Sequence, residues 1–248
     1  MGSIILESKG LCKNFGGLKA IDTLNLILEE GEIRGLIGPN GAGKTTFFNL
    51  ITGRIRPSQG RVFFKGEDIT GIPVHDIVRK GMTRKFQSAN IFLELSLFNN
   101  IAIPLMGKGS LKDIFFLTRH QLKEEIDEIL NIVGLYEKCH ETASNLSHGE
   151  KQWLEIGMCL ANHPALLLLD EPTSGMSPHE TDKTIELIKG IASSKQTIFI
   201  IEHDMYFIRN VAEKITVLHQ GNTLLEGPYS MIEHDERVRK VYLGKENG

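Results

Sequence analysis

The sequence has little of what marks a secreted, a metal-binding or a membrane-spanning chain. Among 248 residues there are three cysteines, Cys12, Cys139 and Cys159, and they form no C-x-x-C pair. A dispersed, odd count of cysteines suits a reducing cytoplasm. The nine histidines show no metal-ligand spacing with one another or with the cysteines. No stretch reaches the about 18 apolar residues needed to span a bilayer.

The charge and the first residues of the chain exclude further classes. A formal net charge of −3 provides no basic footprint for nucleic acid. The first three residues, M-G-S, lead directly into the apolar segment 4–6 with no basic region and no cleavage site, so we expect no secretory leader. Leu6 stands where a myristoylation signal needs Ser or Thr. The hydrophobic content of 41% is enough for a packed core, and the length allows one large α/β domain or two small ones.

The most informative stretch that is present is Gly38–Thr46, which reads G-P-N-G-A-G-K-T-T. It fits the phosphate-loop pattern G-x-x-x-x-G-K-[ST], which arises by chance at about one position in 30,000 at average composition. The apolar run 33–37 before it predicts a strand, and residues 47–51 predict a helix after it. This is the context in which the loop binds phosphates.

The loop can hold phosphates because its glycines let successive backbone N–H groups converge on one anion, and the helix N-terminus adds partial positive charge. Lys44 is expected to reach the β- and γ-phosphates, and the Thr45 hydroxyl is expected to ligate Mg²⁺. The predicted nucleotide-binding residues of this loop are Gly38, Pro39, Asn40, Gly41, Ala42, Gly43, Lys44, Thr45 and Thr46.

Two further patterns lie downstream. The apolar run 165–169 ends in the carboxylates Asp170 and Glu171. Such a run suits a parallel strand that is buried on both faces, and its carboxyl end is where doubly wound sheets place their ligands. Upstream of it, Ser147 and Glu150 have the spacing of a capping box at the start of a helix. Taken alone, that pattern indicates a well-capped helix and nothing more.

With these three patterns in this order, the chain resembles the ATP-binding cassette (ABC) ATPases over almost all of its length. The signature loop of that family is usually L-S-G-G-Q. The chain keeps Ser147 and Gly149 but has His148 and Glu150 at the two variable places. In the stretch 174–178, which resembles the D-loop, Ser177 replaces the usual Asp and leaves its cross-dimer role open.

The resemblance implies roles for residues at matching positions. Asp170 would hold Mg²⁺, directly or through water, and Glu171 would orient and deprotonate the attacking water. His203 resembles the switch histidine, which contacts the γ-phosphate or the water. Gln87 resembles the Q-loop glutamine, which offers its carbonyl to Mg²⁺ and its amide to water. Phe15 resembles the aromatic that stacks on adenine, although an ordinary packed Phe is nearly as good a reading.

The resemblance also implies that the site is shared between two subunits. A helix N-terminus with the Ser147 hydroxyl and the unhindered Gly149 N–H can bind the γ-phosphate of ATP held by another subunit. Two chains would then enclose two ATP molecules. The second ABC ATPase subunit would be identical or similar to this chain, and relatives in this family commonly pair as heterodimers.

The rest of the chain predicts an α/β fold in one domain of residues 1–248. It would contain a nucleotide-binding core, an antiparallel β-subdomain and a helical subdomain near 88–160. Residues 4–35 and 60–66 predict antiparallel strands. Apolar residues at 122, 126, 129, 130 and 133 predict a helix that ends at Gly134. Gly107–Ser110 predicts a flexible joint, followed by an apolar helix at 111–117. Alternating strands and helices are expected at 165–170, 178–193, 197–201, 205–213 and 215–218, with a final hairpin strand at 223–227.

The function implied is hydrolysis of ATP with Mg²⁺, which closes and opens the dimer and drives separate transmembrane permease subunits. Segments 85–101 and 147–158 resemble the ATPases of branched-chain amino acid importers, which also handle amides and urea. Segments 147–158 and 217–221 are especially like the urea-type members, which predicts urea or a short amide as the cargo and leaves branched-chain amino acids as the runner-up. The chain would lie on the cytoplasmic face of the membrane, with a substrate-binding protein as an indirect partner and no nucleic acid.

Two other classes remain as alternatives. Non-transport cassette proteins that act on DNA insert long coiled coils, and those on ribosomes carry two cassettes per chain; this chain has neither feature. A small-molecule kinase or a GTPase could use the same phosphate loop. However, the guanine motif N-K-x-D is absent, and a kinase would not explain Ser147 and Gly149. Phosphate release from ATP without an acceptor would separate an ATPase from a kinase.

Overall fold

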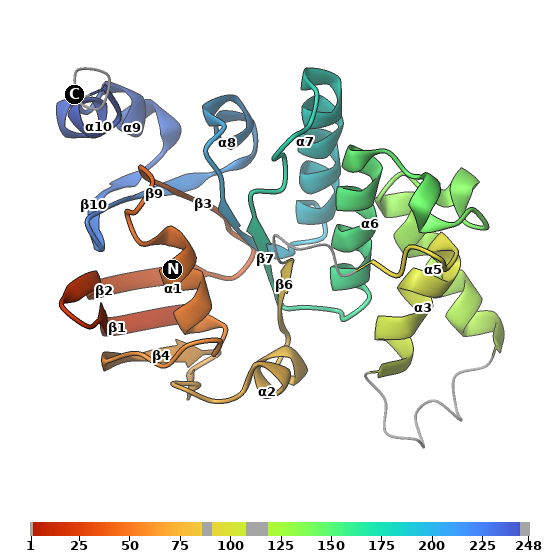
Figure 1. The fold of residues 1–248 in the computed structure, drawn as a ribbon, viewed down its shortest axis with the longest axis horizontal. Coiled ribbons are helices and arrows are strands. Elements are labelled where there is room, and N and C mark those ends of the chain that lie inside the picture. Colours follow the sequence, from red (N-terminus) through yellow and green to blue (C-terminus); the bar gives the residue numbers. More distant parts are fainter. Residues whose placement is uncertain (1, 86–90, 108–118, 244–248) are drawn as a thin grey trace.

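An antiparallel sheet begins the fold (Figure 1), in a computed structural model that describes residues 2–85, 91–107 and 119–243. Its strand order is β2-β1-β4-β5. The sequence alternates turn residues with apolar segments here, and the long strands β1 and β2 pair antiparallel as predicted. The strands are β1 (Ile4–Phe15), β2 (Leu18–Glu29), β4 (Gln59–Phe64) and β5 (Glu67–Asp68).

A second sheet carries the central strands, in the order β10-β9-β3-β8-β7-β6. β10 is antiparallel to β9, and the other neighbours are parallel. Parallel strands end at the same edge of the sheet, so the segments after β3, β7 and β8 meet there. The strands are β3 (Ile33–Ile37), β6 (Met82–Lys85), β7 (Leu166–Asp170), β8 (Thr197–Ile201), β9 (Lys214–His219) and β10 (Asn222–Gly227). We expected residues 4–35 to be wholly antiparallel, which is wrong for β3.

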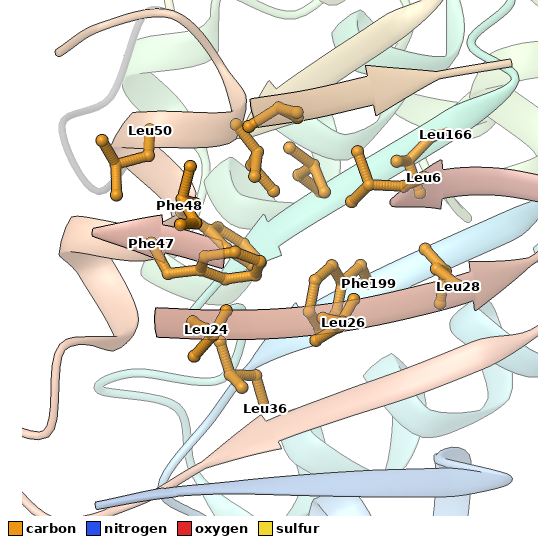
Figure 2. Packing of buried hydrophobic residues seen from close by; sticks show 14 of the residues in the cluster. Leu6, Leu24, Leu26, Leu28, Leu36, Phe47, Phe48, Leu50, Leu166 and Phe199 are labelled. Carbon is orange, nitrogen blue, oxygen red and sulfur yellow. The ribbon is translucent and has the colours of Figure 1, made fainter. Parts of the chain in front are cut away.

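The second sheet is buried on both faces, as the apolar run at 165–169 predicts. Leu166 and Leu168 of β7 pack into a first core, whereas Leu167 and Leu169 pack into a second core on the opposite face. Figure 2 shows the first core, where Phe199 of β8 meets residues of the first sheet and of helix α1 (Lys44–Ile51). The Phe199 ring packs edge-on against Phe48, with centroids 5.1 Å apart. This packing fixes α1, and with it the loop that precedes it.

The second core is covered by α7 (Pro178–Ala192), α8 (Met205–Val211), α9 (Tyr229–His234) and α10 (Glu236–Leu243). The helices expected at 178–193 and 205–213 are therefore present but end one and two residues earlier. The sequence analysis did not predict α9, α10, α2 (Val74–Arg79) or β6. These elements are eight residues long or shorter, so they carry little periodic signal.

A third core joins α3 (Leu97–Gly107), α5 (Arg119–Ile132) and α6 (His148–Leu160), together with two short 3₁₀ turns at Tyr136–Lys138 and Ala143–Asn145. In Figure 1, α3 and α5 lie on the far side of the second sheet from the first sheet. The periodic apolar residues of α5 are buried or half-buried, and Gly134 follows with a φ of +70°. Gly107, expected to open a flexible joint, ends α3, whereas the predicted helix 111–117 lies outside the described residues. None of the described helices is long and apolar enough to span a bilayer.

Candidate functional site

The phosphate loop runs from the end of β3 to the start of α1. Gly38, Gly41 and Gly43 have φ values of +154°, +81° and +105°, which glycine adopts readily. A Cβ atom on Gly38 would lie 2.2 Å from the Leu218 carbonyl oxygen, so any side chain is excluded there. Helix α1 begins after Gly43, with no side-chain cap from the described residues. Its first backbone N–H groups can therefore donate to an anion.

Lys44 lies inside the curl of this loop. Its side chain is buried, and Nζ donates to the carbonyl oxygens of Gly38 (2.7 Å) and Pro39 (3.2 Å). The turn between β9 and β10 braces the loop from behind, because the Gly221 N–H donates to the Ala42 carbonyl oxygen at 2.9 Å. On another side, Tyr242 of α10 lies close to the Gly38 backbone, and burial raises the pKa of its phenol to about 12. The sequence analysis gave neither brace.

A cavity of about 480 Å³ opens beside the loop, a size suited to a small molecule. It brings together ten predicted site residues: Phe15, Asn40, Gly41, Ala42, Gly43, Lys44, Thr45, Thr46, Glu171 and His203. Gly38 and Pro39, also predicted, are not among its lining residues. Leu18, Lys19 and Ala20 at the start of β2 and Gln220 in the β9–β10 turn also line it. The sequence analysis missed them because no local motif marks them. The Phe15 ring is half exposed, with Lys13 Nζ 5.0 Å from its centroid.

Glu171 and His203 face each other where β7 and β8 end. Glu171 Oε1 lies 2.9 Å from His203 Nε2. Glu171 has a φ of +49°, which is unusual for a residue with a side chain. Its backbone N–H donates to the Ile201 carbonyl oxygen at 2.9 Å, which holds this conformation. A carboxylate and an imidazole at this distance, beside a phosphate site, can together orient a water molecule and accept its proton.

Asp170 is buried directly before Glu171. Its Oδ2 accepts a hydrogen bond from the Arg84 guanidinium at 2.5 Å, and its Oδ1 has no hydrogen-bond partner among the described residues. Burial lowers the pKa of Arg84, and the bond with Asp170 opposes that shift. The unpartnered buried oxygen fits a metal ligand or a bound water. Mg²⁺ takes one or two carboxylates together with substrate phosphates, so Asp170 and the hydroxyl of Thr45 in the phosphate loop suit that ion. Gln87 lies outside the described residues.

Strand β6 ends in two buried cations. Arg84 also donates to Asn49 Oδ1 at 2.7 Å, beside the phosphate loop helix. Lys85 pairs with Glu155 of α6, with Nζ and Oε2 3.3 Å apart and both side chains less than 10% exposed. Neighbouring residues of a strand face opposite sides of the sheet. Arg84 therefore contacts α1, the helix that follows the phosphate loop, whereas Lys85 contacts α6.

Ser147 and Gly149 lie at the start of α6, outside the lining of the phosphate-loop cavity. The predicted capping box is present, because Ser147 Oγ accepts from the Glu150 N–H and Glu150 Oε2 accepts from the Ser147 N–H. His148 reaches the D-loop-like stretch, with Nε2 2.9 Å from the Ser174 carbonyl oxygen. Within one chain these residues are therefore not part of the pocket that holds the phosphate loop.

Comparison with known proteins identifies the family. The ABC transporter family model matches residues 21–174. The chain belongs to the ABC transporter family. It is 37% identical to the high-affinity branched-chain amino acid transport ATP-binding protein BraF of Pseudomonas aeruginosa, over 99% of this chain and all of the relative. It is 36% identical to LivG of Escherichia coli K12, over the same shares.

Solved structures agree with this membership of the ABC transporter family. The ADP conformation of MJ1267, an ATP-binding cassette of an ABC transporter, has a TM-score of 0.87 at 27% identity, covering 97% of this chain and 99% of that chain. The fold is therefore that of the ABC ATPases, as the sequence predicted. The enzymatic activity of this family is ATP hydrolysis coupled to transport, and neither the kinase nor the nucleic-acid alternative is favoured.

Proposed function

We propose that this chain is the ATP-hydrolysing subunit of an importer for branched-chain amino acids, and that it works on the cytoplasmic face of the membrane. The observation that carries the proposal is the pairing of Glu171 with His203 at 2.9 Å on the wall of the phosphate-loop cavity. This pair would supply a base and a polar orienting group beside the phosphates of a bound nucleotide. The match to BraF over the length of both chains supports the transport role and the cargo.

In the proposed reaction, ATP lies with its phosphates on the loop and its adenine against Phe15. Lys44 and the first N–H groups of α1 hold the phosphates. Glu171 takes the proton of the water that attacks in line, and His203 keeps the carboxylate and the water oriented. Mg²⁺ would neutralise phosphate charge, held by Thr45 and Asp170. Gln87 would complete that site. Each of these roles is part of the proposal.

The proposed site is completed by a second subunit. Ser147 and Gly149 lie outside the cavity of their own chain, at a helix N-terminus that suits an anion. They would contact the γ-phosphate of ATP bound by the other subunit. Closure of the pair would then depend on ATP, and hydrolysis would open it. Separate permease subunits would convert this movement into transport, and a substrate-binding protein would deliver the cargo.

The cargo has a second candidate. Residues 147–158 and 217–221 resemble the urea-type members of the family, which favours urea or a short amide. The relatives named above are both ATP-binding proteins of branched-chain amino acid transport, and the match to each covers 99% of this chain. We therefore place branched-chain amino acids first.

Uptake in a strain that lacks the gene tests the proposal. Uptake of labelled leucine at low supply should be lost, uptake of labelled urea should stay normal, and the wild-type chain should restore leucine uptake. The Glu171→Gln variant should not restore it, because it lacks the base. The reverse cargo pattern would favour urea. If neither uptake changed, the cargo assignment would fail, while the ATPase assignment would stand.

A further inference from the structure

A buried carboxylate, Glu202, connects the two loops that carry Glu171 and His203. It is the first residue after β8 and only 3% exposed. One oxygen, Oε1, accepts from the Thr173 N–H at 3.0 Å and from the Thr173 hydroxyl. The other, Oε2, accepts from the His203 N–H at 2.7 Å and from the Asp204 N–H at 3.4 Å. Each oxygen thus serves a different loop.

The position of Glu202 explains why such a link is needed. Asp170 and Ile201 are the last partners in the β7–β8 register, and Glu171 still donates to the Ile201 carbonyl oxygen. Beyond this point the two segments that follow β7 and β8 leave the sheet, and their backbone N–H groups no longer pair with a neighbouring strand. Glu202 replaces the ladder with four hydrogen bonds to a charged acceptor, which are stronger than neutral ones.

We propose that Glu202 is a positioning residue that sets the separation of Glu171 and His203 by joining their loops. Thr173 lies two residues after Glu171, and His203 directly follows Glu202, so both side chains depend on the same carboxylate. The inference rests on the roles proposed above for Glu171 and His203. Nucleotide binding should be independent of it, because the phosphate loop is held by β3, α1 and the β9–β10 turn.

The substitution Glu202→Gln tests the link sharply. A Gln side chain has one oxygen and one NH₂ group, whereas every partner of Glu202 is a hydrogen-bond donor. In either orientation the NH₂ group therefore faces the donors of one loop and cannot accept their hydrogen bonds. The kcat for ATP hydrolysis by the full chain should fall about 10- to 100-fold, as expected for a displacement of reacting groups by about 1 Å. The KM for ATP should stay within about twofold, because ground-state binding is unchanged.

A matched control separates positioning from general loss of stability. Glu226 of β10 is a half-buried carboxylate that also accepts several hydrogen bonds, because its Oε2 accepts from Arg34 (2.7 Å) and from the Thr216 hydroxyl (3.0 Å). Glu226→Gln should lower the unfolding temperature and leave kcat unchanged. If Glu202→Gln does not fold, Thr173→Val keeps the shape, removes one donor to Glu202, and should also lower kcat.

A double mutant decides whether Glu202 acts through Glu171. In the Glu171→Gln background, Glu202→Gln should lower kcat by less than about threefold, because the group it positions is already lost. If the loss of kcat in the double mutant equalled the product of the losses in the two single mutants, the proposal would be overturned. A wild-type kcat in Glu202→Gln, with Glu171→Gln slow, would also overturn it and leave the proposed function intact. A fast Glu171→Gln enzyme would overturn both.

Discussion

Two adjacent carboxylates at the end of β7 have opposite surroundings. Asp170 is only 1% exposed and is held by Arg84, whereas the Glu171 side chain is 25% exposed and faces His203 and the cavity. A buried carboxylate with one bonded oxygen is suited to a fixed ion. A partly exposed one beside an imidazole is suited to contact with water. Their surroundings therefore assign them different chemistry.

The substitution Glu171→Gln should separate binding from hydrolysis. It removes the base but keeps the size of the side chain, so phosphate release should slow by about 10² or more. ATP affinity should stay near that of the wild type, because Lys44 and the loop N–H groups remain. Phosphate release and nucleotide titration on the same preparation would check this.

A matched control for this prediction is Glu186→Gln, which changes an exposed carboxylate of α7. It should leave both phosphate release and ATP affinity at wild-type levels. Phosphate release from Glu171→Gln at a rate close to that of the control would exclude Glu171 as the base.

The sequence identifies those site residues that belong to local motifs. The phosphate loop, Asp170 and Glu171 stand in patterns that combine residue type, spacing and a flanking strand. Arg84 and Glu202 were missed as parts of the site, because a charged residue at a strand end has no local sign of its buried partner. Gln220 was also missed, because only the folded chain shows that the turn between β9 and β10 lies against the phosphate loop.

At the scale of elements, α6 and α7 begin with the same device. Ser147 and Ser177 each cap their helix in a capping box, and Pro178 follows Ser177 at the first turn of α7. The two starts are also linked, because the Ser147 hydroxyl donates to Glu180 Oε1 at 3.4 Å. The chain therefore uses Ser177, which replaces the family's usual Asp, as the cap of α7.

The substitution Ser177→Ala should lower the free energy of unfolding by about 0.5–2 kcal/mol, because the cap is lost. Ser177→Thr keeps a hydroxyl and should stay close to the wild type. Urea titration would compare the three proteins. An Ala variant as stable as the Thr variant would contradict the capping role.

The contribution of the Ser177–Glu180 capping box to stability should depend on pH. The Ser177 backbone N–H and the Ser177 hydroxyl both donate to Glu180 Oε2 and hold the pKa of Glu180 below its ordinary value of 4.5. Ser177→Ala keeps the first of these bonds and loses the second. A carboxylate whose pKa is lowered by folding stabilises the folded state at pH values above its pKa in the unfolded chain. This contribution disappears as the pH falls through its pKa in the folded chain. The difference in the free energy of unfolding between Ser177→Ala and the wild type should therefore shrink below about pH 4.5.

The elements that the sequence predicted are those with a long apolar signal. β7 and β8 are continuous apolar runs, and α5 repeats its apolar residues over four turns. Helix α9 was missed because it has six residues and starts at Pro228 without a side-chain cap. Such a helix depends on packing against the second core and not on its own sequence.

At the scale of the whole molecule, the residues of the proposed two-subunit site lie in two separate places on the chain. The cavity with the phosphate loop opens where the second sheet ends, whereas Ser147 and Gly149 lie at the start of α6 and outside that cavity. In the proposed arrangement, a second subunit brings its own Ser147 and Gly149 positions to the phosphates that this cavity would hold.

The substitution Ser147→Arg tests this arrangement. A bulky side chain at the start of α6 should block ATP-driven dimerisation, while ATP binding by the monomer stays nearly intact. Light scattering with and without ATP, in the Glu171→Gln background, would measure it. Ser193→Arg, at the exposed far end of α7, should leave dimerisation unchanged. Loss of ATP binding by monomeric Ser147→Arg would contradict the two-subunit site, and so would normal dimer formation.

The two buried cations at the end of β6 have a consequence for how this protein can evolve. Removing one member of a buried ion pair leaves an uncompensated charge and costs about 3–5 kcal/mol, whereas replacing both members together can be neutral. Arg84 is paired with Asp170, and Lys85 with Glu155. Asp170 is constrained by its site, so Arg84 should be nearly invariant among relatives. Lys85 and Glu155 are free to drift, but only as a pair.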